Sequence, residues 1–316
     1  MRTSPAVSTD GLRKSYGEVV VLDGIDLDIP EGTVFALLGP NGAGKTTMVQ
    51  ILSTLIPADG GHAVVAGADV ATEPDAVRAA IGVTGQFSAV DDLLTGTENL
   101  RLMADLHHLG TAGRRRVADL VDRLDLADVA DRLAATYSGG TRRRLDLAMT
   151  LVGEPRLIFL DEPTTGLDPR SRRGVWQIVR ELVRDGVSVF LTTQYLEEAD
   201  ELADRVALLD GGRIVADGTP AQLKALVPGG HVQLQFTHPA ALAASARQHP
   251  GAVRDDDALT LTVPTDGTVR SLRQVLDTLA DDEGVDDLAL HTPDLDDVFL
   301  ALTGHGASAS AKETAR

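Results

Sequence analysis

The apolar positions in the first two-thirds of the chain form short strand-like runs, separated by amphipathic stretches with helical spacing. We predict strands at residues 34–38, 157–160, 187–192 and 205–209, and helices at 45–55 and 171–184. Alternating strands and helices build a mostly parallel sheet, so we expect an α/β core. A more helical stretch, from about residue 98 to 152, predicts a helical subdomain inserted into that core.

The pattern changes at the breaker cluster Pro228-Gly229-Gly230. Beyond it we predict strands at 231–236, 252–254, 258–263 and 286–291, with helices at 239–248 and 268–280. This β-α-β-β-α-β order fits a small α+β domain of the ferredoxin-like type. The expected organisation is a nucleotide-binding domain over 6–228 with its helical subdomain at about 87–152, a small domain over 229–303 and a disordered tail over 304–316.

Composition narrows the function classes. The 316 residues carry a net charge of −18, which disfavours a free-standing nucleic-acid binder, and contain no cysteine, which excludes disulfides, zinc ribbons, iron–sulfur clusters and a catalytic thiol. No apolar run approaches the roughly 18 residues of a membrane span, and the N-terminus lacks the features of a signal peptide. We therefore expect a cytosolic protein with no direct membrane insertion.

A phosphate-binding loop follows the first predicted strand. The stretch Gly39-Pro40-Asn41-Gly42-Ala43-Gly44-Lys45-Thr46-Thr47 matches G-x-x-x-x-G-K-[ST] at every position. Its glycines allow the backbone to wrap round phosphates, and the N–H groups at the helix start bind the anion. We expect Lys45 to reach the β- and γ-phosphates of a nucleotide and the Thr46 hydroxyl to bind Mg²⁺.

Two carboxylates end the apolar run Leu157-Ile158-Phe159-Leu160. Consecutive side chains at a strand end point in different directions, so one carboxylate can hold a metal while the other faces a water molecule. We assign Asp161 to the Mg²⁺ shell and Glu162 to the general base. The alternative, a solvated acidic turn, is disfavoured by the phosphate loop upstream.

The segment Tyr137-Ser138-Gly139-Gly140-Thr141 resembles the signature of the ATP-binding cassette (ABC) ATPases, which is usually Leu-Ser-Gly-Gly-Gln. Tyr137 and Thr141 depart from that pattern. A hydroxyl, exposed glycine N–H groups and the positive end of a helix still suit an anion. The resemblance covers roughly residues 6 to 225. It implies ATP and Mg²⁺ as ligands, and a signature that binds the γ-phosphate held by the opposite subunit.

Further positions match the same family in order. Tyr16 fits the aromatic residue that stacks on adenine, although an ordinary strand tyrosine is the alternative. Gln86 fits the glutamine that contacts Mg²⁺ and senses the membrane partner. Gly166-Leu167-Asp168 fits the loop that crosses the dimer interface. Asp168-Pro169 also reads as a helix N-cap and first helical residue, and both interpretations can hold.

One departure concerns the γ-phosphate. Gln194 stands where the family usually has a histidine, and a glutamine can form hydrogen bonds but cannot carry a proton. We therefore leave the base role with Glu162 and expect Gln194 to hold the γ-phosphate in line. Residues 192–200 and 293–304, together with the small C-terminal domain, resemble the daunorubicin-resistance type of ABC exporter.

The resemblance implies a homodimer of ATPase subunits on the cytoplasmic side of the cell membrane. It also implies a separate integral membrane permease subunit, through which a drug, antibiotic or lipid-like compound is exported. Another transport system, for lipid or polysaccharide export or for import, is the main alternative. A soluble ABC ATPase acting on the ribosome or on DNA is disfavoured, because the chain has one cassette, no cysteine and an acidic balance.

Overall fold

The computed structural model describes residues 5–85, 89–227, 230–265, 268–279 and 284–303. Gln86 and the tail 304–316, for which disorder is expected, lie outside the described residues. The chain divides into two compact units, Met1–Pro220 and Ala221–Arg316, and each is described by itself.

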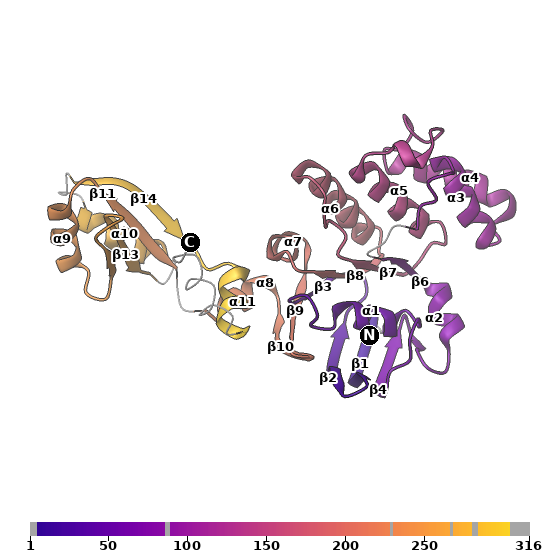
Figure 1. Cartoon of the computed structure of the whole chain (residues 1–316), viewed down its shortest axis with the longest axis horizontal. Coiled ribbons are helices and arrows are strands. Elements are labelled where there is room, and N and C mark those ends of the chain that lie inside the picture. The colour runs from indigo at the N-terminus through magenta and orange to yellow at the C-terminus, as the bar shows by residue number, and fades with distance from the viewer. Residues whose placement is uncertain (1–4, 86–88, 228–229, 266–267, 280–283, 304–316) are drawn as a thin grey trace. The chain divides into compact units, whose positions relative to one another are not determined.

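A six-stranded sheet forms the centre of the first unit, in the order β10-β9-β3-β8-β7-β6 (Figure 1). All neighbouring strands are parallel except the edge pair β9 and β10. The four predicted strands are its four central members, so the predicted α/β core is confirmed. The strands are β3 (Val34–Leu38), β6 (Ile81–Thr84), β7 (Leu157–Asp161), β8 (Ser188–Thr193), β9 (Arg205–Asp210) and β10 (Arg213–Gly218).

A second, antiparallel sheet of the first unit was not predicted. Its order is β2-β1-β4-β5, formed by β1 (Val7–Tyr16), β2 (Val19–Ile29), β4 (Gly60–Val65) and β5 (Ala68–Asp69). The pairing of β1 with β2 shifts register between Thr9 and Leu12 and again after Leu12 and Lys14. Such bulges break the alternation of apolar and polar residues that identifies a strand in a sequence.

The apolar core of the first unit lies between these two sheets, with helix α1 (Lys45–Leu52) in the same layer (Figure 1). Phe190 of β8 packs against Phe35 and Phe159 of the neighbouring strands, with ring centroids 5.2 and 5.4 Å apart. Met48 and Ile51 of α1 are fully buried in the same cluster. This packing fixes the start of α1, and with it the loop between β3 and α1.

Helix α1 ends earlier than predicted, at Leu52 instead of Leu55. Thr54 adopts a left-handed conformation (φ 64°), and the N–H groups of Leu55 and Ile56 bond back to Gln50 O, as in a helix-ending turn. Leu55 is consequently exposed. The helical spacing of apolar residues continues to Leu55, but the backbone leaves the helix after Leu52.

The remaining helices of the first unit lie mainly on the other side of the six-stranded sheet. Helices α5 and α6 cover that face, and α3 and α4 pack with α5 in the predicted helical subdomain (Figure 1). The helices are α2 (Pro74–Ala80), α3 (Gly96–Leu106), α4 (Gly110–Arg123), the 3₁₀ turn η1 (Ala134–Thr136), α5 (Gly139–Leu151), α6 (Pro169–Arg184) and α7 (Leu196–Leu202). Helix α8 (Pro220–Lys224) begins at the last residue of the first unit and otherwise belongs to the second.

The second unit has the predicted β-α-β-β-α-β order, with an antiparallel sheet ordered β12-β13-β11-β14. That strand order is the ferredoxin-like arrangement. Val232, Leu234 and Phe236 of β11 form its core with Leu242 of α9 and Val275 of α10. The elements are β11 (His231–Phe236), α9 (Pro239–Gln248), β12 (Val253–Asp255), β13 (Thr260–Pro264), α10 (Val269–Leu279), β14 (Val285–His291) and α11 (Leu295–Thr303).

Candidate nucleotide-binding and catalytic site

The predicted phosphate loop lies between the end of β3 and the start of α1, packed against two other strands. A Cβ on Gly39 would lie 2.3 Å from the carbonyl oxygen of Leu209, and one on Gly44 would lie 2.9 Å from the Val21 carbonyl oxygen. Gly44 also has a φ of 109°, which L side chains rarely adopt. Glycine is therefore required at both positions, because the loop must turn tightly against β9 and β2.

A cavity of about 440 Å³ opens over this loop. The cavity is lined by Val21, Asn41, Gly42, Gly44, Lys45, Thr46, Thr47 and Glu162. Its floor is the start of α1, where backbone N–H groups and the helix dipole favour an anion. The residues present therefore fit the phosphate chain of a nucleotide.

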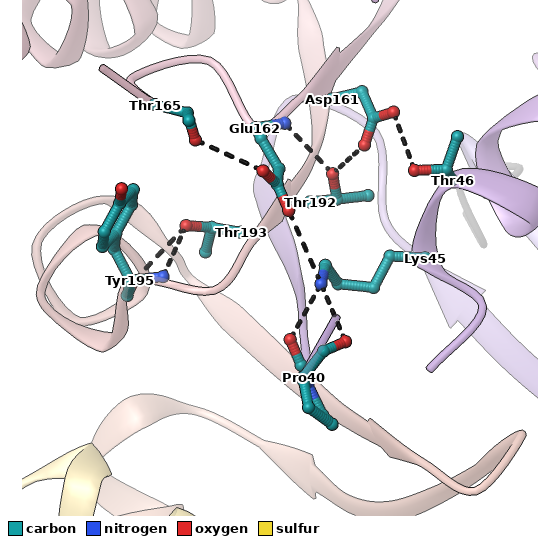
Figure 2. Close-up of polar contacts among 10 residues, drawn as sticks. Pro40, Lys45, Thr46, Asp161, Glu162, Thr165, Thr192, Thr193 and Tyr195 are labelled. Carbon is teal, nitrogen blue, oxygen red and sulfur yellow. Dashed lines mark hydrogen bonds and ion pairs between the residues drawn. The ribbon is translucent and has the colours of Figure 1, made fainter. Parts of the chain in front are cut away.

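Lys45 lies at the centre of the cavity wall with its side chain 5% exposed. Its ammonium donates to Gly39 O (2.8 Å) and Pro40 O (3.1 Å) and lies 3.7 Å from Glu162 Oε1 (Figure 2). Burial lowers the pKa of Lys45, and the charges of Glu162 and Asp161 oppose that shift. The lysine is thus a desolvated donor, anchored by carbonyls and a carboxylate, that a phosphate oxygen can engage.

The two predicted Mg²⁺ ligands lie side by side. Thr46 Oγ1 donates to Asp161 Oδ2 at 3.0 Å, which joins the start of α1 to the end of β7 (Figure 2). Hydroxyl and carboxylate oxygens are ligands that Mg²⁺ prefers, and Mg²⁺ is usually held by few protein groups together with substrate phosphates. A Mg²⁺ ion held here would neutralise part of the phosphate charge.

Glu162 follows Asp161 and turns to the cavity. Its φ of 49° is left-handed, and its N–H donates to both Thr192 O (3.1 Å) and Thr192 Oγ1 (3.2 Å). Thr165 Oγ1 donates to Glu162 Oε2 at 3.3 Å (Figure 2). A non-glycine residue held in this conformation is costly, so β8 fixes the carboxylate at the expense of local backbone strain.

Thr192 was not predicted as a site residue. Besides accepting from Glu162 N–H, it donates to Asp161 Oδ1 at 2.5 Å and is completely buried (Figure 2). One hydroxyl on β8 therefore holds the Asp161 carboxylate and the backbone of Glu162. The contact exists because β7 and β8 are neighbours in the sheet, and no local sequence motif predicts it.

We expect Thr192→Val to destabilise the fold by about 1–3 kcal/mol. Valine keeps the shape of the side chain but lacks the hydroxyl that donates to the buried Asp161 carboxylate. ATP hydrolysis should fall as well, because Asp161 and Glu162 lose their common support. Urea denaturation and an ATPase assay measure both effects. Thr33→Val, which removes an exposed hydroxyl bonded to Pro30 O, is the control. Equal stability and equal hydrolysis in the two variants would contradict this role.

Three further predicted residues lie outside the lining of this cavity or outside the described residues. Tyr16 lies half exposed at the end of β1, with the Lys14 ammonium 5.6 Å from its ring centroid, and is not among the residues lining the cavity. Gln194 lies partly buried between β8 and α7. Gln86 lies outside the described residues.

The signature segment lies at the start of α5. Ser138 caps this helix: its Oγ accepts from Thr141 N–H (3.2 Å) and lies 2.8 Å from Thr141 Oγ1. A Cβ on Gly140 would lie 2.4 Å from Ser171 Oγ. None of residues 138–141 lines the cavity over the phosphate loop of the same chain.

Asp168 caps α6, as one of its two interpretations predicted. Its carboxylate accepts from the N–H groups of Arg170 and Ser171 and from the Ser171 hydroxyl. These hydrogen bonds, that from the Ser171 hydroxyl first, lower the pKa of Asp168. Because Ser171 also abuts Gly140, the signature segment and the loop ending at Asp168 lie next to each other.

Helix α7 carries a buried carboxylate, that of Glu198. Glu198 is completely buried and accepts from Trp176 Nε1–H at 3.0 Å. Burial raises the pKa of Glu198 above the usual 4.5, and the hydrogen bond from Trp176 opposes that shift only in part. From pH 4.5 upward the folded chain keeps a proton that the unfolded chain has lost, so this group reduces stability as the pH rises.

Glu198→Gln is expected to raise the melting temperature at pH 8 and to change it little at pH 4, because the amide oxygen still accepts from Trp176 and carries no charge. Thermal melts at both pH values measure the difference. The matched control is Glu197→Gln on the exposed neighbouring position. A gain of the same size at both pH values would contradict the assigned charge state.

The fold and the site are those of a P-loop nucleoside triphosphatase. The phosphate loop lies between β3 and α1, the Thr46 hydroxyl pairs with the Asp161 carboxylate, and Glu162 lies beside them. The chain matches the ABC transporter family over residues 22–165. It is 51% identical to the daunorubicin resistance ATP-binding protein DrrA2 of Streptomyces coeruleorubidus, over 98% of this chain and 99% of that protein. It is 48% identical to the daunorubicin/doxorubicin resistance ATP-binding protein DrrA of Streptomyces peucetius, over 100% of this chain and 98% of that protein. The chain belongs to the ABC transporter family, as an ATPase that binds and hydrolyses ATP.

Solved structures agree with the fold. The ATP-binding subunit of an ABC transporter superposes with a TM-score of 0.63 at 26% identity, over 70% of this chain and 92% of that one. The dimeric ATP-binding cassette MJ0796 bound to ADP and Pi superposes with a TM-score of 0.60 at 26% identity, over 67% of this chain and 98% of that one. No helix among the residues that the structure describes is long and apolar enough to cross a membrane.

Proposed function

We propose that this chain is the ATP-hydrolysing subunit of an exporter for a drug or antibiotic, working on a separate membrane subunit. The observation that supports the ATPase part is the contact of Thr46 Oγ1 with Asp161 Oδ2 beside Glu162, a pair of oxygens that would suit a Mg²⁺ ion next to the proposed base. The export part is supported by relatives of about 50% identity over nearly the full chain, which are named for daunorubicin resistance.

Each ATP site would be built from two copies. The phosphate loop, Asp161 and Glu162 come from one copy, and Ser138–Thr141 from the other. Two features support this arrangement: residues 138–141 do not line their own chain's cavity, and they lie beside Asp168 on one face. The positive ends of two helices and Lys45 would then surround the negative triphosphate. The dimeric MJ0796 cassette with ADP and Pi is consistent with such an assembly.

Hydrolysis needs a water molecule aligned with the γ-phosphate. We assign the proton of that water to Glu162, whose carboxylate is held by Thr165, and assign phosphate positioning to Lys45 and Gln194. Phosphate binding would draw Lys45 from Glu162 Oε1 and leave that oxygen for the water. Closure of the two copies would move the helical subdomain and, through it, the membrane subunit at the cytoplasmic face.

An efflux assay tests the export proposal. Cells expressing the chain with its membrane subunit should retain less anthracycline than cells expressing the Glu162→Gln variant with the same subunit. Unchanged retention of anthracyclines together with ATP-dependent movement of another compound would favour a different transport system. A chain that binds no membrane subunit would instead favour the soluble ABC ATPases that act on the ribosome or on DNA.

A further inference from the structure

A polar seam joins the signature helix α5 to the edge of the six-stranded sheet. Arg143, Asp146 and Thr150 occupy one side of α5 at spacings of three and four residues. Arg143 Nη1 donates to Gly85 O (3.3 Å), and Asp146 Oδ1 accepts from Ala89 N–H (3.2 Å). Thr150 Oγ1 lies 2.9 Å from Thr84 Oγ1 at the end of β6. These contacts tie the helix to the chain as it leaves the sheet.

Arg143 and Asp146 also bond to each other, with Arg143 Nη1 donating to Asp146 Oδ2 at 3.1 Å. Their side chains are only 11% and 4% exposed. A buried ion pair is weak evidence for stability, because apolar residues of the same volume often serve as well. Arg143 Nε and Nη2 are buried without a hydrogen-bond partner among the described residues. The hydrogen bonds of Arg143 therefore offset only part of the cost of burying its guanidinium group. Stability alone is therefore a weak explanation for this buried pair.

The next residue of the same helix, Arg144, forms an ordinary surface ion pair. Arg144 Nη1 donates to Asp125 Oδ2 at 2.6 Å, but that aspartate side chain is 92% exposed. Among the described residues, the hydrogen bonds of Arg144 go to the helical subdomain, to the Asp125 side chain and to the carbonyl oxygens of Leu124 and Asp125. Arg143 instead donates to Gly85 O, directly after the last residue of β6. Burial lowers the pKa of Arg143, and the charges of Asp146, Glu198 and Asp161 oppose that shift.

Ser138, the N-cap of helix α5, lies five positions before Arg143. A helix is stiff over this length, so any tilt of the seam displaces the Ser138 turn by a similar amount. The displacement matters because anion binding by a helix start needs donors within normal hydrogen-bond distance. The seam is polar, and its directional hydrogen bonds define one orientation of α5 more sharply than apolar packing against the sheet would.

We propose that Arg143 and Asp146 are positioning residues: their hydrogen bonds to Gly85 and Ala89 set the orientation of α5, and so the fit of the Ser138 turn to the triphosphate held by a second copy of this chain. The inference rests on the proposed two-copy site. It predicts that the pair contributes to ATP-dependent dimerisation and not to ATP binding by a single copy.

The test uses the full chain carrying Glu162→Gln, so that ATP is not consumed. ATP affinity is measured at low protein concentration with a fluorescent ATP analogue, and dimerisation by analytical ultracentrifugation with ATP and Mg²⁺. Arg143→Gln and, separately, Asp146→Asn should each weaken ATP-dependent dimerisation at least tenfold while ATP affinity stays within twofold. Arg144→Gln, the matched control on the same helix, should change neither quantity.

Two results would overturn the inference: unchanged dimerisation in the folded variants, or ATP affinity falling by the same factor as dimerisation. Melting curves identify a variant that does not fold, and Asp146→Asn, which keeps an acceptor oxygen, then carries the test. If the Glu162→Gln parent binds ATP but forms no dimer, the proposed two-copy site fails and the inference with it. If the parent dimerises and the variants match it, only the inference fails.

Discussion

Glu162→Gln should lower the rate of ATP hydrolysis by about 10²–10⁴-fold while ATP binding persists, because the amide has the same shape as the carboxylate but cannot accept the proton from water. The side chain is 12% exposed, its Oε1 lies 3.7 Å from Lys45 Nζ, and its Oε2 accepts from Thr165. In glutamine the amide oxygen can keep the contact with Lys45 while the amide NH₂ donates to the Thr165 hydroxyl. Single-turnover hydrolysis and equilibrium ATP binding measure the two effects. The variant should accumulate as an ATP-bound dimer.

Gln194→Ala provides a second comparison, at the residue proposed to hold the γ-phosphate. If Gln194 holds the γ-phosphate in line, hydrolysis should fall although the base is intact. Hydrolysis at the full rate would remove Gln194 from the site. Hydrolysis by Glu162→Gln at the rate of the unaltered chain would show that another group accepts the proton.

Lys45→Ala should weaken ATP binding by roughly 100-fold, the equivalent of about 3 kcal/mol for the loss of a charged hydrogen-bond donor to phosphate. The reason is its burial: Lys45 Nζ is desolvated against Gly39 O and Pro40 O, so its charge acts on the phosphates with little screening by water. Binding of the fluorescent ATP analogue at fixed Mg²⁺ measures the loss.

Lys224→Ala, which removes a lysine of the second unit, is the control for overall charge. Melting curves separate loss of binding from loss of fold, since Lys45 also contacts Glu162 in the cavity wall. ATP affinity within threefold of the unaltered chain in a folded Lys45→Ala variant would contradict the assignment of this cavity to the triphosphate.

Local chemistry explains what could be predicted from the sequence. The phosphate loop needs glycines at Gly39 and Gly44 for steric reasons that hold in any fold of this type, and the structure gives those reasons as contacts with Leu209 and Val21. The buried strands 34–38 and 157–160 are continuous apolar runs, which both faces of a covered parallel sheet require. Asp168 was predicted as a cap from the Asp-Pro pair alone.

Contacts between distant segments explain what could not be predicted. Thr192 lies 31 positions after Asp161, and only the adjacency of β7 and β8 brings the two together. Arg143 looks like one member of an arginine run, and its burial depends on α5 packing against β6. The antiparallel sheet was missed because bulges in β1 conceal its alternation. Each of these features depends on tertiary packing, which local patterns do not specify.

The central claim is that this ATPase drives a separate membrane subunit. The most direct measurement is a mild-detergent purification of tagged Glu162→Gln protein from its native host with ATP present, with co-purifying proteins identified by mass spectrometry. We predict a stoichiometric partner with several transmembrane helices, which is lost when Lys45→Ala is added. Recovery of ribosomal proteins or DNA-repair factors with no membrane protein would contradict the account.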